Sequence, residues 1–213
     1  MHDTDRPKPA HRFDGLLDWS ERAIVLAFFG WLVVRILAVY ATKGSVGDLI
    51  LLSSEGLVVL LVLIRRTASD VSRRPTDWLL AFSATTAPLL VQPTMGQALL
   101  PQSIGVSIML AGMVIQVHAK LVLGRSMGLV AANRGLKLEG PYRYLRHPMY
   151  AGYLLTHVGF LMMNPTGWNL AVYSLCYALQ IPRLLAEERL LCRDPRYAKH
   201  IASVRYRLFP GLF

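Results

Sequence analysis

The sequence is poor in the residues that build disulfide-stapled folds and metal centres. Its 213 residues include only two cysteines, Cys176 in an apolar run and Cys192 in a basic tail. Two cysteines so placed do not make a disulfide framework, and we expect both to be free thiols. There is no HExxH or CxxC motif and no paired His/Asp spacing. The sequence therefore predicts no metal site.

Charged residues are also scarce. Only 17% of the residues are charged and 54% are hydrophobic, and the mean hydropathy is +0.39. Few water-soluble domains of this length are so apolar, so the composition predicts an all-α integral membrane protein. Five acidic residues among the first 22 are atypical of a cleaved signal peptide. We therefore expect the first hydrophobic segment to remain in the mature protein.

Six predominantly apolar segments divide the chain. They cover residues 23–42, 48–64, 77–92, 102–123, 148–163 and 166–186. A helix needs about 20 residues to cross about 30 Å of hydrocarbon, so we interpret these segments as membrane helices. The third and fifth are short, which makes five spans the alternative. The tight connection at Asn164-Pro165 predicts that the last two helices form a hairpin.

The basic residues alternate between successive loops. All the Lys and Arg except Arg35, Lys43 and Lys120 lie in the N-terminal segment, the second and fourth loops or the C-terminal tail. Cytoplasmic loops of membrane proteins retain positive charge, so six spans with cytoplasmic N- and C-termini account for this pattern. The net charge of +10 is thus explained by topology, and we expect no nucleic-acid partner.

Residues 11–22 allow two interpretations. Phe13, Leu16 and Leu17 follow helical spacing, which would lay a short amphipathic helix on the inner membrane surface. A frayed terminus is the alternative.

Polar residues within the predicted spans need partners, because unpaired charges are costly in a membrane. Arg35 and Glu55 are expected at similar depths on adjacent helices, and we interpret them as a structural salt bridge, with a substrate role as the alternative. His118 and His157 are expected either to form packing hydrogen bonds between helices or to line a cytoplasmic cavity.

A basic stretch before the fifth apolar segment predicts an anion site. Gly140-Pro141 indicates a turn, and Pro148 suits the first position of a helix. His147 then lies beside a helix N-terminus. This helix end and the flanking Arg143 and Arg146 would together attract a carboxylate or a phosphate.

A second cluster lies at the cytoplasmic end of the sixth segment. Arg183 and Glu187 are four residues apart and share a helix face, and Glu188 follows. A solvated Arg/Glu pair is the simplest interpretation. The alternative is that a carboxylate holds a cationic or hydroxyl-bearing cofactor group while the arginine orients an anionic substrate group.

These motifs together resemble the isoprenylcysteine carboxyl methyltransferases and their phospholipid methyltransferase relatives. The resemblance covers about residues 121–213 and rests on four motifs in order: Gly140-Pro141-Tyr142, Arg146-His147-Pro148-Met149-Tyr150, Glu187-Glu188, and Tyr197 followed by residues 204–211. It implies an integral membrane enzyme that uses S-adenosylmethionine (SAM). It also implies a cytoplasmic cofactor pocket and a lipophilic or prenylated substrate that enters from the bilayer. Membrane lipids would then surround the protein.

The resemblance also implies residue roles. The cofactor contacts would be Arg134, Gly135, Leu136, Lys137, Tyr142, His147, Pro148, Met149, Tyr150 and Glu187. Arg183 would hold the substrate carboxylate, with Glu188 as a second catalytic candidate. The chain would then comprise three parts: a cytoplasmic N-terminal segment at 1–22, a four-helix membrane region at 23–123, and a catalytic region with hairpin and cytoplasmic tail at 124–213.

Four functions remain open from the sequence. The first is carboxyl O-methylation of an isoprenylcysteine-like substrate, where the nucleophile is already ionised and needs no base. The second is N- or O-methylation of a phospholipid or other lipid, where an amine must lose a proton to a base such as Glu188, His147 or a tyrosine. A nicotinamide-dependent membrane reductase with a similar Arg-His-Pro region and a non-catalytic scaffold are the remaining alternatives.

Overall fold

The computed structural model describes residues 12–43, 57–68, 70–92 and 98–211. These residues are mostly helical, which confirms the predicted all-α class, and the strands among them are only two residues long. The chain divides into two compact units. One comprises residues 1–72 and 123–136, and the other residues 73–122 and 137–213.

The first unit is built on helix α1, Arg12–Lys43. A helical stretch at 57–64 follows, and strand β1, Asp70–Val71, pairs antiparallel with β2, Ala132–Asn133. The 3-10 helix η2, Gly124–Ser126, leads toward β2. The strand pairing ties the segment before residue 72 to the returning segment 123–136.

The start of α1 differs from both expectations for residues 11–22. From Arg12 onward the chain is helical and continuous with the predicted first span, so it is neither a separate surface helix nor a frayed end. Asp18 and Glu21 are buried, whereas Leu16 and Trp19 are exposed. The acidic face is buried because arginines of the same unit bind it, as described below. The predicted Arg35–Glu55 pair lies outside the described side chains.

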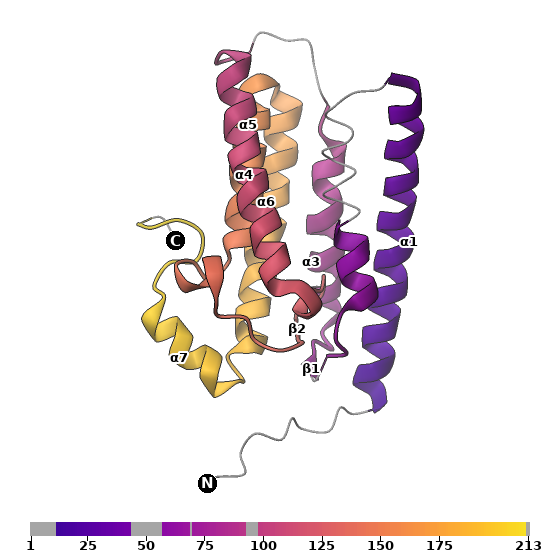
Figure 1. The fold of residues 1–213 in the computed structure, drawn as a ribbon, viewed down its shortest axis with the longest axis vertical. Coiled ribbons are helices and arrows are strands. Elements are labelled where there is room, and N and C mark those ends of the chain that lie inside the picture. The colour runs from indigo at the N-terminus through magenta and orange to yellow at the C-terminus, as the bar shows by residue number, and fades with distance from the viewer. Residues whose placement is uncertain (1–11, 44–56, 69, 93–97, 212–213) are drawn as a thin grey trace. The chain divides into compact units, whose positions relative to one another are not determined.

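The second unit contains the remaining helices. They are α3 (Pro75–Thr86), continued by the 3-10 helix η1 (Ala87–Leu90), α4 (Gln102–Leu123), the 3-10 helix η3 (Gly140–Arg143), α5 (Pro148–Met163), α6 (Gly167–Leu191) and α7 (Pro195–Ser203). Helices α4, α5 and α6 run side by side in Figure 1. Helix α5 begins at Pro148, as predicted from the preference of proline for the first helical position.

Small residues let α4 and α5 approach backbone to backbone. A Cβ atom placed on Gly152 would lie 2.6 Å from the backbone nitrogen of Gln116 and 2.7 Å from the carbonyl oxygen of Gly112. No side chain fits at such distances, so Gly152 fixes the contact between the two helices. This close packing holds the first turn of α5 in place beside α4.

Polar contacts at both ends hold α3 antiparallel to α6. At one end Arg189 donates to both carboxylate oxygens of Asp77, each at 3.0 Å. At the other, just beyond η1, the side-chain amide of Asn169 bonds both the backbone N–H and the carbonyl of Gln92, at 2.9 Å each. These contacts set which residues of α3 lie opposite the C-terminal end of α6.

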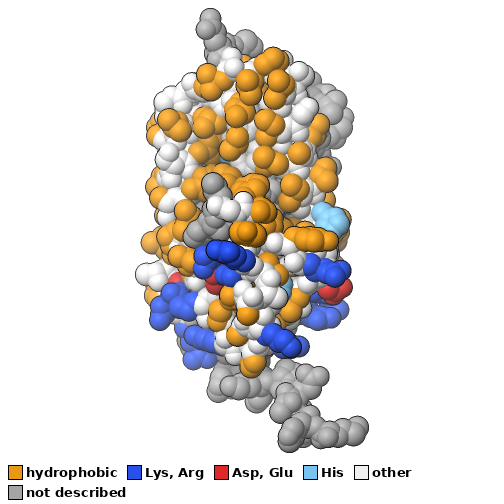
Figure 2. Space-filling view, turned by 90° about the vertical axis from the view of Figure 1, so that its left-hand side faces the viewer, with side chains coloured by type: hydrophobic (Ala, Val, Ile, Leu, Met, Phe, Trp, Pro, Cys, Tyr) orange, Lys and Arg blue, Asp and Glu red, His pale blue; other side chains and the backbone are white. Residues whose placement is uncertain are grey.

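Among the described residues, one helical stretch, Gln102–Ser126, is long and apolar enough to cross a membrane. Helix α5 has 16 residues, which at about 1.5 Å per residue gives roughly 24 Å, less than the thickness of the hydrocarbon. On the face shown in Figure 2, hydrophobic side chains cover one end and Lys and Arg side chains gather toward the other. The count of six spans stays a prediction.

Candidate functional site

The N-terminus of α5 is fixed by the C-terminal tail. The backbone N–H groups of Arg146 and His147 donate to the carbonyls of Tyr206 and Arg207, at 3.0 and 2.9 Å. The guanidinium of Arg146 also donates to the carbonyl of Val204 at 2.7 Å. These bonds position the residues immediately before Pro148.

Glu188 is the carboxylate that Arg146 and His147 bind. Its Oε1 lies 3.3 Å from His147 Nε2 and 3.4 Å from Arg146 Nη1, and its Oε2 accepts a hydrogen bond from Arg207 Nε at 2.9 Å. The residue is only 6% exposed. A carboxylate of the chain itself thus meets the basic cluster where the sequence predicted an anion site.

These partners determine the protonation of Glu188. Burial alone raises its pKa, but the hydrogen bonds from His147 and Arg207 outweigh burial and lower the pKa to about 2. A carboxylate with so low a pKa is a weak base at neutral pH. The geometry therefore favours an electrostatic and positioning role for Glu188 over that of a general base.

Arg183 and Glu187 meet at Tyr150. The hydroxyl of Tyr150 donates to Glu187 Oε2 at 3.0 Å, and the guanidinium carbon of Arg183 lies 5.6 Å from the centre of the same ring. A guanidinium above an aromatic face is attracted by the ring electrons. The two α6 residues that share one helix face thus converge on a single residue in the first turn of α5.

Helix α3 also contributes to this cluster. Arg183 Nη1 donates to the hydroxyl of Thr85 at 3.1 Å and to the side-chain oxygen of Gln180 at 3.4 Å. Arg183 is 8% exposed, so these bonds are largely shielded from water. Thr85 could not be singled out from the sequence, because an isolated threonine in an apolar segment carries no motif.

Two tyrosines bring hydroxyl groups into the same unit. Tyr142 is buried and its hydroxyl lies 3.5 Å from the carbonyl of Ala119. Tyr197 of α7 is also buried, and its hydroxyl has no hydrogen-bond partner within the described ranges. Burial and the carboxylates of Glu187 and Glu188 raise the pKa of Tyr197. Its hydroxyl is therefore a neutral, buried donor at neutral pH.

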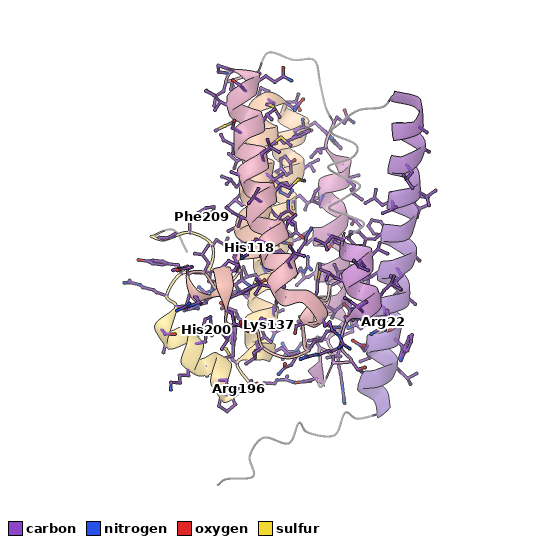
Figure 3. The ribbon with its side chains drawn as sticks, in the orientation of Figure 1. Arg22, His118, Lys137, Arg196, His200 and Phe209 are labelled. Carbon is purple, nitrogen blue, oxygen red and sulfur yellow. The ribbon has the colours of Figure 1, made fainter. Side chains whose placement is uncertain are left out.

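The other predicted residues of this unit lie in different surroundings. Pro148 and Met149 are buried in the first turn of α5. Lys137, labelled in Figure 3, is half-buried on the connection between β2 and η3. Nζ of the buried Lys120 lies 5.4 Å from the centre of the Tyr153 ring, which places a second cation beside α5.

His157 forms packing contacts between α5 and α6. Its Nδ1 lies 2.9 Å from the Tyr177 hydroxyl, and its ring stacks on Tyr173 with 4.5 Å between centres. These contacts match the packing interpretation of this histidine. His118 lies on α4, facing the turn at Gly140, where a Cβ would lie 3.6 Å from its Nε2.

Arg134 belongs to a buried ionic cluster of the first unit. It donates to Asp18 Oδ1 at 2.9 Å and binds Glu21 Oε2. Arg65 contacts Asp18 Oδ1 and Glu21 Oε1, both at 3.1 Å. All four side chains are almost fully buried, so the guanidinium of Arg134 is held by acids of α1.

The same cluster shapes the segment before β2. Glu21 Oε1 accepts hydrogen bonds from the backbone N–H groups of Leu129 and Val130, at 2.6 and 3.0 Å. Gly135 has φ +98°, a conformation that favours glycine, and leads to the half-buried Leu136. The sequence did not reveal this cluster. The one pattern that could have indicated it is the pair of acids Asp18 and Glu21, which are three residues apart and share one face of a helix whose opposite face is apolar.

Comparison with known proteins supports the interpretation of this region. Residues 100–194 match the family model for phospholipid methyltransferases, a segment that includes α4, α5 and both Glu187 and Glu188. No curated protein matches the chain. The match covers slightly less than half of the chain and confirms the resemblance found in the sequence. The match indicates a membrane methyltransferase, of a class for which SAM is the implied methyl donor.

Proposed function

We propose that the protein transfers a methyl group from SAM to the carboxylate of an isoprenylcysteine-like lipophilic substrate, which enters from the bilayer. The observation that carries this proposal is the placement of Arg183. Its buried guanidinium lies over Tyr150, whose hydroxyl binds Glu187 one turn further along α6. A fork of guanidinium donors is suited to a carboxylate.

The residues near Tyr150 fit the chemical groups of SAM. SAM carries a positively charged sulfur, an ammonium group and ribose hydroxyls. Glu187 offers a partly exposed carboxylate to a cation or a hydroxyl, and the buried hydroxyl of Tyr197 has no hydrogen-bond partner within the described ranges. The residues of the second unit proposed to hold SAM are Lys137, Tyr142, His147, Pro148, Met149, Tyr150 and Glu187.

The reaction needs little proton chemistry from the protein. When bound, SAM supplies a methyl group on a sulfonium, and the C–S bond breaks as the carboxylate oxygen forms the new O–C bond. Arg183 orients that carboxylate, which is already ionised and needs no base. Glu188 stays ionised and holds His147, Arg146 and Arg207 at the start of α5.

The alternative is N-methylation of a phospholipid amine, which the description of the matching family favours. Two features weigh against it. An ammonium must lose a proton before attack, and Glu188, with a pKa of about 2, is a poor acceptor. The buried cations Arg183 and Lys120 lie against the rings of Tyr150 and Tyr153, so a cationic headgroup there would meet like charge. The match gives no support to a reductase or a scaffold.

We also propose that the chain is a multi-pass membrane protein with six helices and cytoplasmic N- and C-termini. The alternation of basic and non-basic loops supports this topology. It would place Arg183, Glu187 and Glu188 at the cytoplasmic membrane boundary.

Methyl transfer from labelled SAM tests the proposal directly. Detergent-purified protein is assayed separately with N-acetyl-S-farnesylcysteine, with its carboxamide, and with vesicles containing phosphatidylethanolamine. We expect label in the acid alone, and loss of turnover in Arg183→Met with S-adenosylhomocysteine (SAH) binding retained. Label in phosphatidylethanolamine would overturn the proposed acceptor. No label in any acceptor together with no SAH binding would overturn the proposed function.

A further inference from the structure

We propose that Thr85 of α3 is a positioning residue that holds the guanidinium of Arg183 in the orientation needed for the acceptor carboxylate. This inference rests on the proposed function. Residue 85 lies outside the segment that matches the methyltransferase family. The inference therefore extends the acceptor site to a helix that carries no methyltransferase motif.

The hydrogen-bond directions at Thr85 are fixed by its neighbours. A hydroxyl has one hydrogen, and that of Thr85 donates to the carbonyl of Ala81 at 2.7 Å. An oxygen lone pair is then left to accept from Arg183 Nη1, which lies 3.1 Å away. The hydroxyl is thus held by its own helix and presents an acceptor to α6.

Three helices together restrict Arg183. Thr85 contacts it from α3, Gln180 from the preceding turn of α6, and Tyr150 of α5 lies below its guanidinium. A long arginine side chain loses rotamer freedom when it is fixed. Because the contacts fix Arg183 before the substrate arrives, this loss is not incurred on binding.

The chemistry of Thr85 and Gln180 as hydrogen-bond acceptors suits an anion-binding arginine. The oxygens of Thr85 and Gln180 are neutral, so each orients the guanidinium without cancelling its charge. A carboxylate at either position would form an ion pair and compete with the carboxylate of the substrate. A hydroxyl at residue 85 therefore serves orientation better than an acid would.

The adjacent threonine provides a matched control. Thr86 is half-buried like Thr85, and its hydroxyl donates within α3, where the carbonyls of Phe82 and Ser83 share its hydrogen at 3.0 and 3.3 Å. Thr86→Val therefore removes the same kind of helix-internal bond as Thr85→Val. The two variants differ in the contact with Arg183.

The experiment compares Thr85→Val, Thr85→Ser and Thr86→Val in the full chain. Titration in detergent measures the binding of N-acetyl-S-farnesylcysteine (the acid), of its carboxamide and of SAH. The thermal midpoint of each variant is measured as well, together with kcat and KM for the acid. We expect Thr85→Val to weaken binding of the acid about tenfold and to raise KM similarly, the size of one hydrogen bond to a charged group. Binding of the carboxamide and of SAH should stay within about twofold, and Thr85→Ser and Thr86→Val should behave as wild type.

The outcomes separate the inference from the proposed function. If Thr85→Val matches Thr86→Val in acid binding, or weakens acid and carboxamide equally, the positioning role is wrong. Thr85→Ala replaces Thr85→Val if the latter does not fold. If the wild type binds the acid but transfers no methyl group to it, the proposed function fails, and the comparison of acid with carboxamide still decides the role of Thr85.

Discussion

Tyr150 donates its hydroxyl hydrogen to Glu187, with 3.0 Å between the two oxygens, and so ties the first turn of α5 to the end of α6. The face of the same ring lies against Arg183. One tyrosine therefore joins the carboxylate proposed to hold SAM to the arginine proposed to hold the acceptor.

Tyr150→Phe separates these two functions. It removes the hydrogen bond to Glu187 and keeps the ring below Arg183, so we expect SAH binding to weaken about fivefold, corresponding to roughly 1 kcal/mol. The KM for the acid acceptor should change less than about twofold. Calorimetric titration with SAH and steady-state kinetics measure both. An equal loss in both quantities would show that the ring does not act independently on the two groups.

Glu188→Gln tests the structural importance of the buried carboxylate. The amide keeps the shape but removes the charge opposite His147, Arg146 and Arg207, so these groups lose their counterion. We expect a loss of about 2–4 kcal/mol in the free energy of unfolding. Glu139→Gln, on an exposed residue, is the control and should change the thermal midpoint little. A Glu188→Gln variant as stable as wild type would contradict the assignment.

The lowered pKa of Glu188 also predicts an acid limit to stability. A carboxyl group with a folded pKa of about 2, below its ordinary 4.5, stabilises the fold fully above the ordinary value. That stability is lost as the pH falls from about 4.5 toward about 2. Thermal midpoints measured between pH 7 and pH 3 should therefore fall in acid, and fall less steeply in Glu188→Gln. Identical slopes would mean that Glu188 is not responsible.

The helices could be predicted from the sequence, but most side-chain pairings could not. Apolar runs and the prolines at 148 and 165 marked α4, α5 and α6 closely, because helix formation and termination are local. Asp18 and Arg134 bind one another although they lie more than a hundred residues apart in the chain. No local rule links them, so the sequence identifies Asp18 only as one of five N-terminal acids, and the resemblance implies Arg134 only as a cofactor contact.

The candidate site was partly predictable for the same reason. Arg183 and Glu187 are one turn apart on one helix, so their shared face follows from spacing alone. Their meeting at Tyr150 depends on how α5 packs against α6, and the contribution of Thr85 depends on how α3 packs against α6. Tertiary packing of this kind leaves no periodic signal in the sequence.

Arg134→Met tests what the buried cluster of the first unit does. The change leaves Asp18 and Glu21 without one of their two arginines, and we expect it to destabilise the fold by about 3–5 kcal/mol. Arg66→Met, which changes an exposed residue nearby, is the control. Weakened SAH binding without any change in thermal midpoint would instead assign Arg134 to the cofactor alone.

The most direct test of the central claim is calorimetric titration of the wild type, Glu187→Gln and Arg183→Met with SAH. We predict that the wild type binds SAH and that Arg183→Met binds it with nearly the same affinity. In Glu187→Gln the affinity for SAH should fall about tenfold or more, which corresponds to at least roughly 1.4 kcal/mol. Absence of SAH binding by folded wild-type protein, or equal loss in both variants, would contradict the assignment of Glu187 to the methyl donor and Arg183 to the acceptor.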